Sequence, residues 1–412
     1  MRKMKAMALL TAVAVLFAAG AARAGDAASA AVDGVYTSFS EARKASEAQN
    51  LPILLRIGKG WCKSCSHFDK AFEEEMEFKA AVSKHAVLCA VDAKEGDGTD
   101  LARMYSVSDY PVVTFILANG NGDLLDRWES YWSSENFLEH LTAAVENPLT
   151  VHERMVRFRE HPTEIDARKL GELRDYAGYY AEANAYYQRA RTLNPASETN
   201  YDLFILMAMA KGLEGQLYGA DAVRKQADAV MAASKESPKD LLKVAYTMGM
   251  VAKATDDMNN YVPYLKTAVD MAAGVEDESV RQSRSKLMPD YALHVEKNAH
   301  KAVEYKKASF AETSAPENWL ENPNLLNNLA WWCFENEINL DEAEDFARKG
   351  IELAEEGTEK GNILDTLAEI CNLKGDCGEA VDYIRLAVAE DPDNPYFQKQ
   401  LVRFEKLLAD MK

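Results

Sequence analysis

The stretch "IGKGWCKSCSHFDKAF", residues 57–72, decides how the N-terminal part of this 412-residue chain is interpreted. It contains Cys62 and Cys65, preceded by a strand-like apolar run and followed by a helical pattern. Residues three apart lie on one helix face, so the two sulfurs would be close enough to form a disulfide. In the first turn of a helix, unpaired backbone N–H groups and the helix dipole stabilise a thiolate. The pair therefore has three candidate roles: a redox pair, part of a metal site or a structural disulfide.

Strand and helix patterns alternate around this stretch and predict a small α/β domain. The two last strands are joined by "ANGNG", whose Asn-Gly pair is a strong hairpin signal. In chain order the predicted elements are a helix (38–49, capped by Ser38 or Ser40), a strand (51–58), one long helix from Cys62 towards Lys84, a strand (86–93), a short helix (98–107), two strands (110–117 and 123–130) and a helix (133–145).

Two well-separated motifs in residues 35–147 resemble the thioredoxin superfamily. The first is "WCKSC" at 61–65, directly after a strand, and the second is Tyr110-Pro111 at the start of the hairpin, where that family has an X-Pro step. The helix that precedes the core strand is most similar to the exported, thioredoxin-like branch of the superfamily.

The resemblance implies a set of roles for the residues of both motifs. Cys62 would be the nucleophile of thiol–disulfide exchange and Cys65 the shielded, resolving cysteine. Pro111 would be a cis-proline packed against the sulfurs. Together with Tyr110, whose backbone would bind substrate peptide, it would shape a groove flanked by Trp61.

Arg56 departs from the thioredoxin pattern. A typical thioredoxin has a buried aspartate five residues before the tryptophan, and here that position is Arg56. A cation near the pair would favour the thiolate and the dithiol form, while the missing acid would slow proton transfer. Lys59 and Lys63 would add positive charge. Alternatively, Arg56 extends to solvent or pairs with an acid.

The other interpretations of the cysteine pair have less support. A structural zinc site normally needs four ligands in paired clusters, whereas the remaining cysteines occur singly and His67 stands alone. We therefore predict no metal and no bound cofactor. A structural disulfide is compatible with an exported protein, but a four-residue loop gains little chain entropy. Of the other cysteines, Cys89, Cys333 and Cys371 are predicted to be packing residues, and Cys377 could form a disulfide across one helical hairpin.

Residues 149–412 show only helical periodicity, and parts of this segment align with one another. They resemble tetratricopeptide repeats, in which small residues let two antiparallel helices approach. The resemblance is specific over 325–395 and fair over 165–197, whereas between 201 and 310 no repeat register is predicted and the repeat count stays open. The aligned residues are Gly178 with Gly375, Ala183 with Ala380, Tyr186 with Tyr383, Ala190 with Ala387, Pro195 with Pro392, a third copy with Ala343, Phe346 and Gly350, and Leu326, Leu329, Ala330 and Cys333 with Leu364, Leu367, Ala368 and Cys371.

The chain begins with a basic stretch, an apolar run to about Gly20 and small residues, a pattern that predicts a signal peptide over 1–24 and an exported, periplasmic or extracellular protein. Its formal net charge is −19, so nucleic-acid binding is not expected. No later segment is apolar for long enough to span a membrane.

The sequence thus predicts an α/β thioredoxin-like domain (33–148) followed by an all-α, tetratricopeptide-like domain (149–412). The expected function is thiol–disulfide exchange with protein substrates, with an envelope redox partner implied by resemblance and protein contacts through the helical repeats. The alternative is a non-catalytic adaptor that uses the thioredoxin-like unit for docking.

Overall fold

The computed structural model describes residues 34–58, 63–107, 113–234, 237–313 and 319–410. It forms two compact units that meet in the sequence between Asn147 and Pro148. None of the described helices is both long and apolar enough to cross a membrane.

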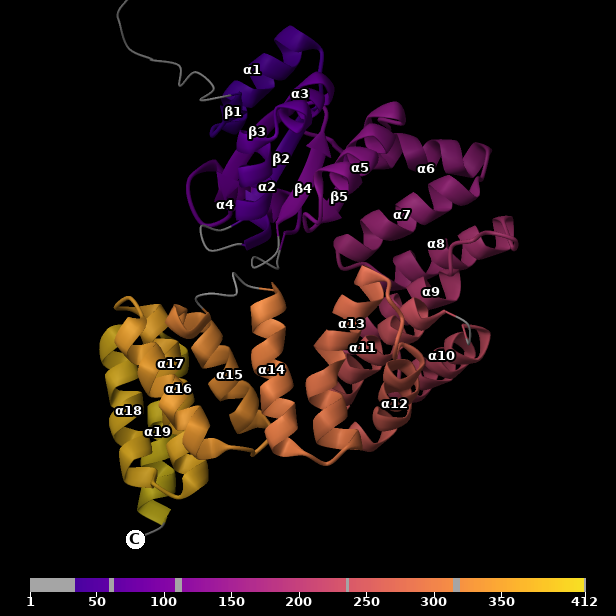
Figure 1. Ribbon diagram of the computed structural model, residues 1–412. Coiled ribbons are helices and arrows are strands. Elements are labelled where there is room, and N and C mark those ends of the chain that lie inside the picture. The colour runs from indigo at the N-terminus through magenta and orange to yellow at the C-terminus, as the bar shows by residue number, and fades with distance from the viewer. Residues whose placement is uncertain (1–33, 59–62, 108–112, 235–236, 314–318, 411–412) are drawn as a thin grey trace, which may run out of the picture. The chain divides into compact units, whose positions relative to one another are not determined.

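The first unit is a five-stranded sheet with helices on both faces (Figure 1). The strand order is β1-β3-β2-β4-β5; β1, β3 and β2 are parallel, and β4 is antiparallel to β2 and β5. The strands are β1 (Val35–Tyr36), β2 (Ile53–Gly58), β3 (Val87–Asp92), β4 (Thr114–Ala118) and β5 (Leu124–Glu129), and the helices are α1 (Phe39–Gln49), α2 (Lys63–Glu74), α3 (Met76–His85), α4 (Asp97–Met104) and α5 (Ser134–Glu146).

The element order agrees with the sequence-based prediction apart from two differences: the two-residue strand β1 was not predicted, and two helices, α2 and α3, replace the one long helix that was predicted. β2 lies between β3 and β4, and all its residues except Arg56 are buried. The hairpin after β4 is confirmed: the Asn119 side-chain oxygen accepts the backbone N–H groups of Asn121 (3.0 Å) and Asp123 (2.9 Å), and Gly122 has a φ of 90°. Positive φ at the last turn position is where glycine is needed.

The prediction of one long helix from Cys62 towards Lys84 is wrong, because the helix ends at Glu74 and α3 begins at Met76. In a continuous helix, Phe72 and Phe78 would point about 120° apart, since each residue turns the helix by about 100°. The break reorients the chain, so that the Phe78 ring contacts both Phe68 (5.8 Å between centroids) and Phe72 (6.5 Å). One apolar core thereby receives aromatic residues from both helices.

The first helix is capped from a distant part of the chain. Ser38 is the N-cap residue, as predicted, but its side chain makes no capping hydrogen bond within α1. Instead, the Asp97 carboxylate at the start of α4 accepts the backbone N–H of Phe39 at 2.8 Å. A carboxylate at this position satisfies an otherwise unpaired N–H and favours the positive end of the helix dipole.

The second unit is a series of antiparallel helix pairs, α7/α8 to α17/α18, followed by α19 (Figure 1). Residues 201–310, for which no register was predicted, also form pairs of helices. The helices are α6 (Val151–Glu160), α7 (Glu164–Tyr176), α8 (Tyr180–Leu193), α9 (Tyr201–Lys211), α10 (Ala220–Ala233), α11 (Pro238–Thr255), α12 (Val262–Met271), α13 (Glu278–Asp290), α14 (Ala299–Thr313), α15 (Pro323–Glu335), α16 (Leu340–Leu353), α17 (Thr358–Lys374), α18 (Cys377–Glu390) and α19 (Pro395–Asp410).

Small residues allow close approach within these pairs. Ala183, Ala190, Ala380 and Ala387, aligned in the sequence, are all fully buried. At Gly171 in α7, an added Cβ would lie only 2.5 Å from the Tyr187 ring of α8. The large ring fills the space that the missing side chain leaves, which is how a close-packed interior is built.

Polar contacts join neighbouring repeats at roughly the repeat period. The Tyr264 hydroxyl donates to Asp228 (2.6 Å), and the Tyr396 hydroxyl donates to Asp365 (3.1 Å). These pairs are 36 and 31 residues apart, close to the 34-residue period of tetratricopeptide repeats. Asp228 lies on α10 and its partner Tyr264 on α12. Asp365 lies on α17 and its partner Tyr396 on α19, so in both cases the tyrosine is two helices further along the chain.

We expect Gly171→Ala to lower the free energy of unfolding by about 1–3 kcal/mol, because the new methyl group overpacks the buried Tyr187 ring. Gly378→Ala in α18 is the matched control, since a Cβ there meets nothing within 4 Å. In that exposed helical position alanine should be neutral or slightly stabilising. Urea unfolding followed by circular dichroism measures both, and equal effects of the two changes would contradict the packing argument.

We expect the helical unit to lose stability as the pH rises and the buried carboxyl group of Asp365 loses its proton. Burial raises the pKa of Asp365 to about 6, and its second oxygen has no hydrogen-bond partner among the described residues. Since the folded-state pKa exceeds the unfolded value, the folded state binds the proton more tightly, and stability falls as the pH rises from about 4 to above 6. Asp365→Asn should therefore raise the free energy of unfolding at pH 8 by about 1–2 kcal/mol.

Thermal unfolding of Asp365→Asn between pH 4 and pH 8 checks this expectation. The exposed Asp345 in α16 provides the control substitution Asp345→Asn. A variant that is less stable than the parent at pH 8 would show that the carboxylate contributes more through its hydrogen bond than burial costs.

Candidate active site

Cys65 lies in the first turn of α2, the helix that follows the central strand β2 in the sequence. It is 2% exposed and disulfide-bonded. The four other cysteines that the structure describes, Cys89, Cys333, Cys371 and Cys377, are free and buried. Cys62, which directly precedes α2 in the sequence, lies outside the described residues.

Packing of Phe68 holds α2 on the sheet. Phe68 is 1% exposed, and its ring lies 4.9 Å from that of Phe115 in β4 and 5.0 Å from that of Phe137 in α5, measured between centroids. Cys65 belongs to the same apolar core. Since Cys65 and Phe68 are three residues apart, they share a helix face, and the packing that buries the ring also buries the sulfur.

Ser64 connects the start of α2 to the segment before β4. Its hydroxyl oxygen accepts the backbone N–H of Val113 at 3.1 Å, and Val113 itself is fully buried. Val113 follows the 108–112 segment, which contains the predicted substrate residues. Ser64, which lies between the two cysteines in the sequence, therefore holds Val113, the residue that precedes β4.

An ion pair joins β2 to α2 on the polar side of the site. Arg56 donates from Nε to the Asp69 carboxylate at 3.1 Å and makes a second, parallel hydrogen bond through its other guanidinium nitrogen. The Arg56 side chain is 13% exposed and that of Asp69 is 41% exposed. Burial raises the pKa of Asp69 above its usual value, although the Arg56 charge opposes this rise.

One of the alternatives predicted for Arg56 was pairing with an acid, and this alternative is confirmed. The Asp69 carboxylate balances the positive charge of Arg56. Asp69 is four residues after Cys65, on the same helix face, which is the signal that could have identified it. Ser64 belongs to the cysteine motif, but the sequence assigned it no role, and its hydrogen bond to Val113 was not anticipated. Whether Arg56 influences the thiolate stays a prediction.

Several predicted site residues lie where the structure gives no side-chain description. Lys59, Trp61, Tyr110 and Pro111 fall outside the described residues, so the cis-proline prediction also stays untested. Lys63 is the first residue of α2. His67 is exposed on the same helix.

Three of the four free cysteines lie in environments that disfavour thiolates. Burial raises the pKa of Cys89 and of Cys333 to about 12, and that of Cys371 to about 11. Cys371 and Cys377 are both free, so no disulfide joins them. Because the thiolate is the reactive form of cysteine, these three buried thiols with raised pKa values are poor nucleophiles.

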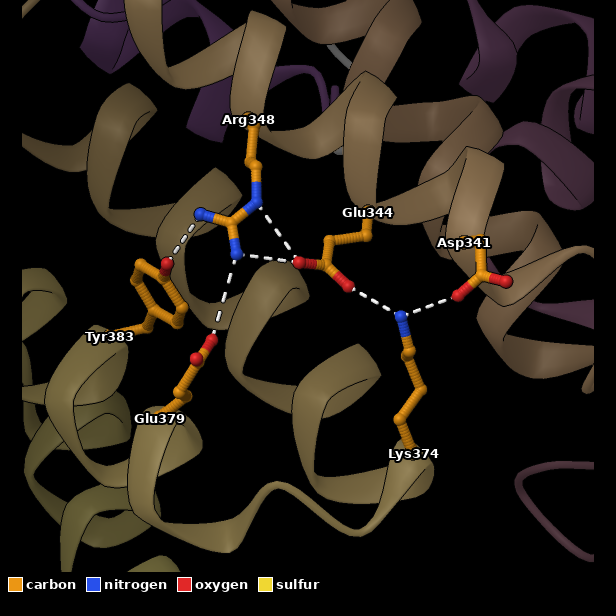
Figure 2. A network of polar contacts seen from close by, with 6 residues as sticks. All are labelled: Asp341, Glu344, Arg348, Lys374, Glu379 and Tyr383. Atoms are coloured by element: carbon orange, nitrogen blue, oxygen red, sulfur yellow. Dashed lines mark hydrogen bonds and ion pairs between the residues drawn. The ribbon is translucent and has the colours of Figure 1, made fainter.

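One group of three potential metal ligands, Glu344, Cys371 and Glu379, occurs in the part of the chain that the structure describes. Figure 2 shows that Glu344 already lies between two cations: Lys374 bonds one carboxylate oxygen at 2.7 Å, and Arg348 bonds the other at 2.5 Å. Arg348 also approaches Glu379 at 3.6 Å. The carboxylates are thus neutralised by side chains, and the cluster is best explained as an ion-pair network between α16, α17 and α18.

Comparisons with known proteins concern both parts of the chain. Residues 35–118 match the family model described as thioredoxin-like. No curated protein matches the sequence. Similar solved structures include a tetratricopeptide repeat protein from Parabacteroides merdae, which is 12% identical and aligns over 66% of this chain and 95% of its own with a TM-score of 0.38. A thermophilic TPR protein from Thermus thermophilus is 16% identical over 60% of this chain and 100% of its own, with a TM-score of 0.25.

The protein is therefore a two-part chain, in which a thioredoxin-like domain is followed by tetratricopeptide-like helical repeats. Assignment of the repeats rests on the paired helices, their buried small residues and the period of their polar contacts.

Ser64→Ala should loosen the segment before β4, because the Val113 N–H loses its acceptor at a cost of about 1 kcal/mol. We expect the hydrogen-exchange protection of the Val113 amide to fall about fivefold, with little change at β2. Ser64→Thr keeps a hydroxyl and should retain most of the protection. Unchanged exchange at Val113 in Ser64→Ala would show that this hydrogen bond does not order the segment.

Proposed function

We propose that this protein is an exported thiol–disulfide oxidoreductase that uses the Cys62 and Cys65 pair. The observation that carries the proposal is the disulfide-bonded Cys65, buried at the start of α2 behind the central strand of a thioredoxin-like domain. The other described cysteines are free, which supports Cys62, the remaining cysteine of the sequence, as the proposed partner.

The proposed reaction is a pair of thiolate displacements. In the reducing direction, the Cys62 thiolate attacks a substrate disulfide, forms a mixed disulfide and releases one substrate thiolate. The Cys65 thiolate then attacks the Cys62 sulfur, releases the second substrate thiolate and forms the Cys62–Cys65 disulfide. Two electrons pass from the pair to the substrate, and the oxidising direction is the reverse.

The surroundings of Cys65 suit the resolving role. A sulfur that is 2% exposed is poorly accessible to an external protein disulfide, but is reached by a neighbouring sulfur within the mixed disulfide. The first turn of α2 carries no acidic residue that would oppose a thiolate there. The positive end of the helix dipole also favours an anion at this turn.

The helical repeats would supply contacts with protein partners, since stacked helix pairs present extended surfaces. An envelope protein dithiol or disulfide would exchange electrons with the pair. The N-terminal pattern of basic, apolar and small residues supports export to the periplasm or the extracellular space.

Cys62→Ser should abolish disulfide exchange with insulin as substrate, because the attacking thiolate is lost. Cys65→Ser should instead accumulate a mixed disulfide with the substrate, since nothing resolves it, and this adduct is detected by non-reducing electrophoresis. Cys89→Ser is the matched control and should keep full turnover. Turnover that survives in Cys62→Ser would favour the alternative of a non-catalytic adaptor.

A further inference from the structure

The exposed face of α11 carries a stripe of basic and apolar side chains without an acid. The stripe consists of Lys239, Lys243, Tyr246, Met250 and Lys253. Their spacing of four, three, four and three residues puts them on one side of the helix. Tyr246 is 57% exposed and Met250 is 41% exposed, so the apolar members of the stripe are available for contact.

A cavity of about 220 Å³ lies beside this stripe, between α9, α11 and α13. Lys243 and Tyr246 form part of its wall, and Met207 of α9 and Leu242 supply apolar surface. Thr247, Ser283 and Lys286 complete the lining. The cavity can hold one apolar side chain, with lysine ammonium groups at its edge.

The lysines of the stripe differ from most other basic residues of the helical unit. Many cations elsewhere in this unit are paired, as Lys266 is with Asp270 and Lys374 with Glu344. In the part of the chain that the structure describes, Lys239, Lys243 and Lys253 form no ion pair. They stand on a chain with a formal net charge of −19. On an acidic protein, a positive stripe whose lysines form no ion pair favours an anionic partner.

Two further basic residues lie close to the Lys253 end of the stripe. Burial lowers the pKa of His294 in the π-helical turn Tyr291–Val295 and of Lys306 in α14, and the Lys253 charge lowers both further. Asp290 faces the same groups and accepts the Tyr261 hydroxyl at 3.1 Å. Lys306 lies over the rings of Phe310 and Trp332 rather than against a carboxylate.

The geometry points to a docking site for an extended acidic peptide segment, whose apolar residue enters the cavity while its carboxylates contact the α11 lysines. From Lys239 to Lys253 the stripe is about 21 Å long, at about 1.5 Å per helical residue. An extended peptide covers this length with about six residues, at about 3.3 Å each. The proposal rests on the partner-binding role proposed for the repeats and is independent of the redox chemistry.

Fluorescence anisotropy with a labelled peptide of about nine residues tests the site in the full mature chain. The probe has a central leucine flanked on both sides by glutamate and aspartate. We expect saturable binding that weakens as the salt concentration rises from about 0.03 M to 0.15 M, because the lysines are exposed. A lysine-flanked peptide should not bind, and a central serine should weaken binding about fivefold or more.

Substitutions in the stripe identify the surface. Lys243→Glu and Lys253→Glu should each weaken binding about fivefold to tenfold, and Tyr246→Ala about fivefold. Lys225→Glu makes the same charge change on an exposed lysine of α10 and should leave the affinity unchanged. Equal effects of Lys225→Glu and Lys243→Glu would overturn the proposal, as would the absence of binding at the lower salt concentration.

Two further outcomes separate this proposal from its alternatives. A single-stranded thymidine oligonucleotide that binds as tightly as the peptide, with the same sensitivity to Lys243→Glu, would show a general anion surface and overturn peptide docking. Cys65→Ser should bind the probe with the parent affinity. Peptide binding is compared between the parent and Lys243→Glu, and insulin turnover between the parent and Cys62→Ser, so failure of peptide binding and failure of the redox function are distinguished by separate measurements.

Discussion

The candidate active site depends on the packing of Phe68. Its ring contacts aromatic residues from α3, β4 and α5, and this contact fixes α2 along the sheet. Cys65, Phe68 and Phe72 lie on one helix face, so the helix cannot bury the rings without burying the sulfur. The burial of Cys65 is therefore a consequence of the core. The Ser64 hydrogen bond then joins the first turn of α2 to Val113, which precedes β4. The Arg56–Asp69 ion pair joins the following turn to β2.

A comparable constraint organises the helical repeats, where the distance between paired helices is set by small residues facing large ones. Gly171 faces Tyr187, and Gly361 faces Phe397. The array is less regular near Pro289, which lies inside α13 and is followed by the π-helical turn Tyr291–Val295. A proline removes a helical N–H, and a π turn adds a residue to the helical repeat. The apolar core is also divided here, into one cluster ending near Met288 and another beginning near Ala292.

These features explain which parts of the fold and of the candidate site could be predicted from the sequence. The strands and the helix pairs at 325–395 have strong local periodicity, and a shared helix face likewise implied that the sulfur of Cys65 is shielded. Between 201 and 310 no register was predicted, and the last part of this segment contains a helical proline, Pro289, and a π turn that disturb the period there. The break between α2 and α3, the remote capping of α1, the partner of Arg56 and the hydrogen bond of Ser64 all depend on how β2, β4 and the helices pack together. Of these contacts, the partner of Arg56 alone leaves a local signal, the four-residue spacing between Cys65 and Asp69.

The division of the chain into two kinds of domain has a physical rationale under the proposed function. Thiol–disulfide exchange needs only brief contact between sulfurs, and a small reactive turn provides little binding energy for a particular protein. Helical repeats can provide that energy, because apolar and charged side chains from successive helices line one surface. When the two are linked in one chain, a partner held by the repeats meets the reactive turn at an increased effective concentration, provided that the linker allows it. Substrate preference would then depend on the charge of the repeat surface, while the rate of exchange would depend on the turn around Cys65.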